Sequence, residues 1–150
     1  MEKKELLNIL DGILVPEGFK KKGNSWVING KEITKIINLQ KSQFGNNFYI
    51  NYGYIINSIP LNNLLMHIFS GLGSLDNDKN KRIKELLNLE EDISDKDRAI
   101  ELKNILVHKV VEKLNKNETE IDVLQELKLR AQLHNIPLVV KQHFNLVDES

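Results

Sequence analysis

The chain has 150 residues, with 21 basic and 21 acidic residues, a formal net charge of zero, and no cysteine. Disulfides, thiolate metal sites and cysteine nucleophiles are therefore excluded, and the balanced charge argues against a chain specialised for nucleic acid or anionic membranes. No apolar run approaches the ~20 residues that span a bilayer, and the charged first residues are not those of a signal peptide. We expect a single cytoplasmic domain over residues 1–150.

An amphipathic helix is predicted for residues 2–14, where leucine and isoleucine recur at helical spacing. Val15-Pro16 ends it, because the residue before a proline avoids the helical region. In the segment that follows, we expect Phe19 to be buried and Lys20–Lys22 to be solvated. The alternative is that these lysines bind RNA, together with aromatic residues of the sheet.

Three antiparallel strands are predicted over residues 26–28, 32–42 and 48–56. Asn29-Gly30 predicts a two-residue turn that pairs Trp26 with Ile33, because a type I′ turn needs positive φ at both central positions. A loop after Ser42 then pairs the second and third strands. Alternation along the strands places one apolar set on the face that helices are expected to cover. That set comprises Trp26, Ile33, Ile37, Leu39, Ile50, Tyr52 and Tyr54, with Leu39 opposite Ile50 and Ile37 opposite Tyr52.

The opposite face of the two longer strands carries a polar set: Asn38, Gln40, Ser42, Tyr49 and Asn51. The predicted register puts Gln40 beside Tyr49 and Asn38 beside Asn51. Antiparallel sheets commonly leave one face in water, which explains the pattern without a function. Amides and a tyrosine on a rigid sheet also suit recognition of a protein, because tyrosine gives contact area at a low entropic cost. These five residues are the candidate binding surface.

The second half of the chain is predicted to be mainly helical. Pro60 begins a helix to about Phe69, since proline suits the first helical turn, and His67 is expected on its exposed side. The segment Ser70–Ser74 ends that helix. Residues 82–89 fit either a helix or a fourth strand.

Two later sequences resemble capping boxes. Ser94-x-x-Asp97 predicts a helix over 94–114, and Thr119-x-x-Asp122 predicts one over 119–134, with Ala131 among its inward residues. The conformation of residues 138–146 is left open between a last helix over 138–144, which we favour, and a docked extended segment.

No catalytic or metal-binding signature is present in the sequence. The four histidines, His67, His108, His134 and His143, form no His-Glu-x-x-His pair. Asp76–Asn80 resembles the start of a calcium loop, but Lys81 stands where that loop needs glycine, so a polar turn is predicted. No serine lies in a Gly-x-Ser-x-Gly elbow. We predict no catalytic residue, no metal and no cofactor, and we lean against an enzyme.

Part of the chain resembles a known family. The similarity is carried by Leu14-x-x-Glu-Gly-Phe-Lys-Lys with Trp26, by residues 37–45 (Ile-Asn-Leu-Gln-Lys-Ser-x-Phe-Gly), and by Phe48-Tyr-Ile-Asn-x-Gly53. Over about residues 5–57 the chain resembles the bacterial domain-of-unknown-function 4304 family. This resemblance implies a small bacterial α+β domain and brings no established reaction or catalytic residues.

The sequence thus predicts an α+β fold: an antiparallel three- to four-stranded sheet with one face covered by helices, and a helical C-terminal half. The predicted function is a non-catalytic protein-binding module, and an immunity protein is one form of it that we consider. The alternative is a small-molecule-binding or enzymatic domain with a pocket between the sheet and the C-terminal helices. Neither membrane nor nucleic acid is expected as a partner. If the third strand is an edge, a second copy could pair with it to form a homo-oligomer.

Overall fold

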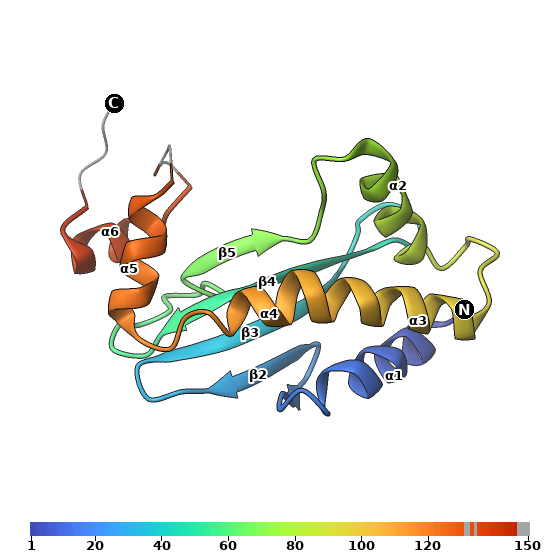
Figure 1. The fold of residues 1–150 in the computed structure, drawn as a ribbon, viewed down its shortest axis with the longest axis horizontal. Coiled ribbons are helices and arrows are strands. Elements are labelled where there is room, and N and C mark those ends of the chain that lie inside the picture. Colours follow the sequence, from blue (N-terminus) through green and yellow to red (C-terminus); the bar gives the residue numbers. More distant parts are fainter. Residues whose placement is uncertain (131–132, 134, 147–150) are drawn as a thin grey trace.

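The computed structural model describes residues 1–130, 133 and 135–146. In this part of the chain an antiparallel five-stranded sheet carries helices on one face, and helices follow the sheet towards the C-terminus (Figure 1). The α+β class and the helical C-terminal half are confirmed, with five strands in place of three or four. None of the described helices is long and apolar enough to cross a membrane.

The first helix and the segment after it agree with the sequence. Helix α1 (Lys3–Leu14) buries Leu6, Leu10, Ile13 and Leu14 against the core. Phe19 is buried and Lys20–Lys22 are exposed, as expected, but these lysines form the short strand β1 (Lys20–Lys22) instead of a loop.

The first predicted turn lies two residues too early. Strand β2 (Ser25–Asn29) pairs with β3 (Ile33–Lys41) so that Trp26 faces Ile37 and not Ile33. The turn is centred on Lys31 and Glu32, and the N–H of Gly30 donates to the carbonyl of Ile33 at 3.0 Å. The change in pairing is an even number of residues, so every side chain keeps its predicted face.

The register between β3 and β4 (Phe48–Ile56) is the predicted one. Leu39 faces Ile50, and Ile37 faces Tyr52. The whole apolar set named from the sequence is buried in the main core: Trp26, Ile33, Ile37, Leu39, Ile50, Tyr52 and Tyr54. However, β4 is not an edge strand, because β5 (Ile68–Gly71) pairs with it, and the order is β1-β2-β3-β4-β5.

The helix predicted for residues 60–69 is wrong. Asn62 and Asn63 have φ values of 49° and 70°, in the left-handed region that no α-helix contains. The chain from Asn57 to His67 is an irregular loop, and Ile68 then pairs with Tyr54 in the sheet. A helix here would leave backbone N–H and C=O groups of β4 without hydrogen-bond partners. Pairing of β5 with β4 therefore outweighs the local helical pattern. The predicted end of that helix at 70–74 instead contains the last two residues of β5 and the residues that follow it.

Of the two predictions for residues 82–89, helix or strand, the structure agrees with the helix. Helix α2 (Asn77–Leu86) begins at Asp76, whose side chain accepts a hydrogen bond from the N–H of Lys79 at 3.0 Å. The predicted polar turn is therefore the N-cap of a helix. Beyond the helix, Asn88 forms a single antiparallel bridge with Asn47.

The long predicted helix over 94–114 is confirmed. It comprises α3 (Asp95–Ile105), a π-helical segment η1 (Leu106–Val111) and α4 (Glu112–Leu114), and Ser94 caps its start by accepting from the N–H of Asp97. It crosses the inner face of the sheet beside α1 (Figure 1).

The last two helices are shorter. The capping box of Thr119 and Asp122 is present, but α5 (Glu120–Lys128) ends before the predicted residue 134. Ala131 and His134 lie outside the described residues. Helix α6 (Leu138–Phe144) confirms the favoured reading of 138–144.

Candidate functional site

The sheet has a second face that points away from α1 and α3, here called the outer sheet face. Strand alternation places Lys20, Lys22, Ser25, Val27, Asn29, Thr34, Ile36, Asn38, Gln40, Tyr49, Asn51, Gly53, Ile55, Phe69 and Gly71 on it. Among these strand residues the only charged side chains are Lys20 and Lys22. This face therefore combines amides, aromatic rings and two cations, without a carboxylate.

The structure brings four of the five predicted surface residues together. Asn38 lies opposite Asn51 and Gln40 lies opposite Tyr49, as predicted. Tyr49 is 51% exposed and Gln40 is exposed, whereas Asn51 is buried and donates to the side-chain oxygen of Gln40 at 2.9 Å. Asn38 donates to the hydroxyl of Ser25 at 3.0 Å. Hydrogen bonds thus hold the side-chain amides of Asn38, Gln40 and Asn51 in place.

The fifth predicted residue serves the turn. The hydroxyl of Ser42 accepts the N–H of Phe44 at 3.1 Å, where β3 ends, and Phe44 itself is 78% exposed. Ser42 therefore stabilises the turn beside the other four residues of the candidate binding surface.

A small apolar cluster lies on another part of the outer sheet face. Val27, Ile36 and Met66 form a small buried cluster, with Ile55 packed against it. Met66 comes from the loop over 57–67 and lies close to Gly53, where an added Cβ would stand 2.9 Å from its sulfur and 1.7 Å from the carbonyl oxygen of Ile68. Only glycine permits this close approach of backbone and loop.

A pocket opens at the end of the sheet, beside Tyr49. It has a volume of about 290 Å³ and is lined by Asn47, Phe48, Tyr49, Leu72, Asn80, Ile83, Lys84 and Leu87. We call it the sheet-end pocket. Its lining is apolar, with two amides and one lysine. Sequence reasoning missed it, because it depends on the contact between α2 and the start of β4, two elements far apart in the chain.

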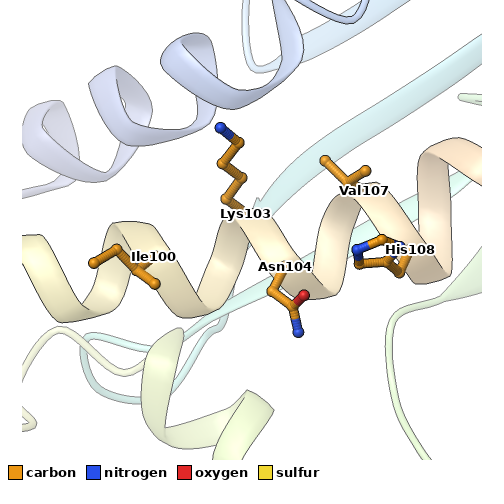
Figure 2. Close-up of a pocket in the computed structure, with 5 residues that line it drawn as sticks. All are labelled: Ile100, Lys103, Asn104, Val107 and His108. Atoms are coloured by element: carbon orange, nitrogen blue, oxygen red, sulfur yellow. The ribbon is translucent and has the colours of Figure 1, made fainter.

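The long helix bears two further grooves. One, of about 380 Å³, is lined by Ile100, Lys103, Asn104, Val107 and His108 (Figure 2). The other, of about 270 Å³, lies towards α2 and shares Asn104 and His108. His108 is exposed and contacts Glu112 at 3.2 Å. Both grooves are open hollows on the helix surface.

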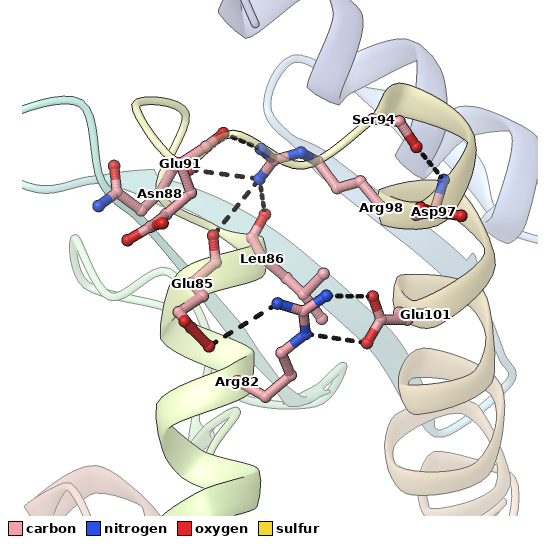
Figure 3. A network of polar contacts seen from close by, with 9 residues as sticks. All are labelled: Arg82, Glu85, Leu86, Asn88, Glu91, Ser94, Asp97, Arg98 and Glu101. Carbon is pink, nitrogen blue, oxygen red and sulfur yellow. Dashed lines mark hydrogen bonds and ion pairs between the residues drawn. The ribbon is translucent and has the colours of Figure 1, made fainter.

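Two arginines join α2 to α3 (Figure 3). Arg82 donates to both carboxylate oxygens of Glu101, at 2.9 and 2.6 Å, and this arginine lowers the pKa of Glu101. Arg98 is fully buried and donates to the carbonyls of Glu85, Leu86, Asn88 and Glu91. Burial lowers the pKa of Arg98. The guanidinium satisfies carbonyls at the C-terminus of α2, so its role is structural.

His67 is not the exposed helix residue that the sequence predicted. It is fully buried, its Nδ1 accepts from the N–H of Ile56 at 2.8 Å, and its Nε2 donates to the carbonyl of Pro60 at 2.9 Å. A neutral imidazole satisfies both bonds and fastens the loop over 57–67 to β4. Among the described residues, no group of three or more acidic or histidine side chains is placed to hold a metal ion, and His134 lies outside them.

A polar cluster missed by sequence reasoning fixes the end of the long helix to the sheet. Buried Lys35 contacts Asn115 at 3.0 Å and Glu118 at 2.5 Å. The hydroxyl of Tyr54 donates to the carbonyl of Leu114 at 3.0 Å, and burial raises the pKa of that hydroxyl. The described cavity between this part of the sheet and the C-terminal helices is about 10 Å³, room for about one water. The predicted alternative, a small-molecule pocket in this place, stays a prediction.

Comparison with known proteins identifies one family. A family model described as "Domain of unknown function (DUF4304)" matches residues 10–121, which is more than half of the chain. No curated protein and no solved structure matches the sequence.

Proposed function

We propose that this chain, which belongs to the DUF4304 family, is a non-catalytic protein-binding domain whose interface is the outer sheet face. The observation that carries the proposal is the exposed ring of Tyr49 beside amides that hydrogen bonds hold in place. Interfaces are enriched in tyrosine, and prepositioned polar groups lose little entropy on binding.

The charge of this face suggests the chemistry of the partner. Lys20 and Lys22 stand at one edge of it, and none of its described strand residues is acidic. Charge complementarity therefore favours a partner with an acidic contact surface. A bacterial cytoplasmic protein that neutralises or escorts such a partner, as immunity proteins do, is the form of this function that we expect.

Site-specific photocrosslinking in the native cells tests the proposal. A photoreactive amino acid at Tyr49 or Gln40 is expected to trap one and the same partner protein, because both side chains are exposed on the outer sheet face. The matched control is the same group at Ile121, an exposed residue of α5 on another part of the molecule. Mass spectrometry identifies the trapped protein.

A second set of variants tests whether binding depends on the positive charges of the outer sheet face. Replacing Lys20 and Lys22 by glutamate is expected to reduce crosslinking from Tyr49 by roughly tenfold, because the variant repels an acidic surface. Replacing Lys3 and Lys4 on α1 is the control. Equal trapping from Tyr49 and Ile121, or none from either sheet position, would contradict the proposal.

A further inference from the structure

The two edges of the sheet differ in how they are protected. Strand β1 (Lys20–Lys22) consists only of lysines, and charged edge residues are a common means of preventing strand pairing. Strand β5 (Ile68–Gly71) contains neither a charge nor a proline. It is the outermost strand on its side of the sheet (Figure 1). Of the two edges, β5 is the one open to a further strand.

The backbone of β5 presents free ladder groups at this edge. The N–H of Leu72 donates to the carbonyl of Ile50 at 2.8 Å, and Ser70 pairs with Tyr52, so even-numbered residues bond to β4. Phe69 and Gly71 therefore direct their N–H and C=O groups outwards. No other described residue donates to or accepts from these groups, and the side chain of Phe69 is 51% exposed.

Positive side chains flank the same edge. Lys84 lines the sheet-end pocket, which also includes Leu72, the residue directly after β5. On the inner side, Lys113 and Arg130 lie with Glu126 around the narrow cavity beside Ser70. The linings of these two cavities thus contain three cations and one carboxylate. An extended segment with acidic residues matches that charge, whereas a second copy of β5 would bring like charges together.

We propose that β5 accepts an extended acidic segment of the partner protein as a sixth strand, with one apolar side chain in the sheet-end pocket. This inference rests on the proposed function and specifies its partner. In strand addition, main-chain hydrogen bonds supply affinity and side-chain pockets supply specificity. Phe69 and Gly71 supply the bonds, and the pocket of about 290 Å³ admits one apolar anchor.

Selection from a phage-displayed library of random peptides against the full chain provides the probe. The enriched peptides are expected to alternate apolar and acidic residues. When such a peptide binds, amide hydrogen exchange at Phe69 and Gly71 is expected to slow at least about tenfold, because those N–H groups become hydrogen-bonded.

Two pairs of variants test the geometry. Gly71→Pro removes an outward N–H at an edge position that tolerates proline, whereas Gly71→Ala keeps that N–H and meets no atom within 4 Å. We expect peptide affinity to fall about tenfold in the proline variant only. Lys84→Glu is expected to weaken binding about fivefold, while Lys81→Glu on the same helix leaves it unchanged. The urea unfolding midpoint of each variant confirms its folding.

Several outcomes would overturn strand addition. They are the absence of any enriched peptide, equal binding to the two Gly71 variants, and self-association that is lost in Gly71→Pro, which would assign the edge to a second copy. Photocrosslinking from Tyr49 that persists unchanged in Gly71→Pro would refute the sixth strand while leaving the proposed function intact. If Gly71→Pro abolishes both that crosslink and peptide binding, the result supports the sixth strand and the proposed function.

Discussion

At the scale of single residues, Gly53 determines how the loop over 57–67 meets the outer sheet face. Any Cβ at this position would stand 1.7 Å from the carbonyl oxygen of Ile68, so the backbone itself would have to move. We expect Gly53→Ala to lower the free energy of unfolding by about 3 kcal/mol. Urea denaturation measures it.

An opposite result is expected for the control Gly12→Ala. Gly12 is exposed in α1 and has no atom near the added methyl group, so alanine should stabilise the helix by about 0.5–1 kcal/mol. Equal effects of the two substitutions would show that the close approach at Gly53 is not present in solution.

His67 is the second residue on which that loop depends. His67→Phe leaves the N–H of Ile56 and the carbonyl of Pro60 without their partners, and we expect a loss of about 2–3 kcal/mol of stability. His108→Ala at an exposed position should change stability by less than about 0.5 kcal/mol. Thermal unfolding of both variants tests this, and similar small changes would contradict a structural role for His67.

At the scale of elements, Arg98 links α2 to α3 through backbone carbonyls. Arg98→Lys is expected to cost about 2 kcal/mol, because an ammonium cannot reproduce the forked guanidinium that reaches four carbonyls. Arg82→Lys at the half-exposed ion pair should cost less than about 1 kcal/mol. Chemical denaturation gives both values, and a smaller loss for Arg98→Lys would be evidence against the capping role.

The pair of Arg82 and Glu101 predicts a pH dependence with a definite sign. Arg82 lowers the folded-state pKa of Glu101 below its ordinary value of 4.5. The stabilisation is therefore fully present above about pH 4.5 and is lost as the pH falls through the folded-state pKa. The difference in stability between the natural chain and Glu101→Gln should shrink below that pH. A difference that is constant down to strongly acidic pH would contradict the ion pair.

The elements that could be predicted from the sequence are those that depend on the alternation of side chains along strands and on helix-capping residues. Alternation gave the faces of β2, β3 and β4, because slipping by one residue would have buried Asn38 and exposed Leu39. Thr119 and Asp122 marked a helix start through a local hydrogen-bond pattern. These features depend on neighbours in the chain.

The failures concern interactions between distant segments. Leu61, Leu64 and Leu65 after Pro60 have a helical pattern, but the left-handed Asn62 and Asn63 let the chain return to β4 as a fifth strand. That error concealed Phe69 as part of the sheet, and Met66 and His67 as parts of the loop that packs against it. The sheet-end pocket could not be predicted either, because its lining comes from three segments that are distant in the sequence. Four of the five predicted surface residues do lie together.

At the scale of the whole molecule, one sheet face carries the core and the other faces outwards. The helices α1 and α3 cover the buried set around Trp26 and Ile37. The amides, Tyr49 and the sheet-end pocket lie together where the outer sheet face meets α2. Rigid support from the covered face and a polar, partly aromatic open face are the features that we expect of a protein-recognition domain.

Salt is expected to weaken the partner complex mainly by slowing the association of the two proteins. Raising the ionic strength from about 0.05 to 0.5 M shortens the range of the field around Lys20, Lys22 and Lys84, so the association rate should fall by about tenfold or more. The dissociation rate should change less. Surface plasmon resonance with the crosslink-identified partner measures both rates, and a salt-independent association rate would speak against an acidic contact surface.

Binding of a partner to the outer sheet face and to β5 is tested by amide hydrogen exchange of the chain with and without its crosslinked partner. We expect slower exchange in the complex for β4, β5 and the turn after Ser42, with α1 and α3 unchanged. Protection confined to α1, α3 or the grooves beside His108 would contradict it.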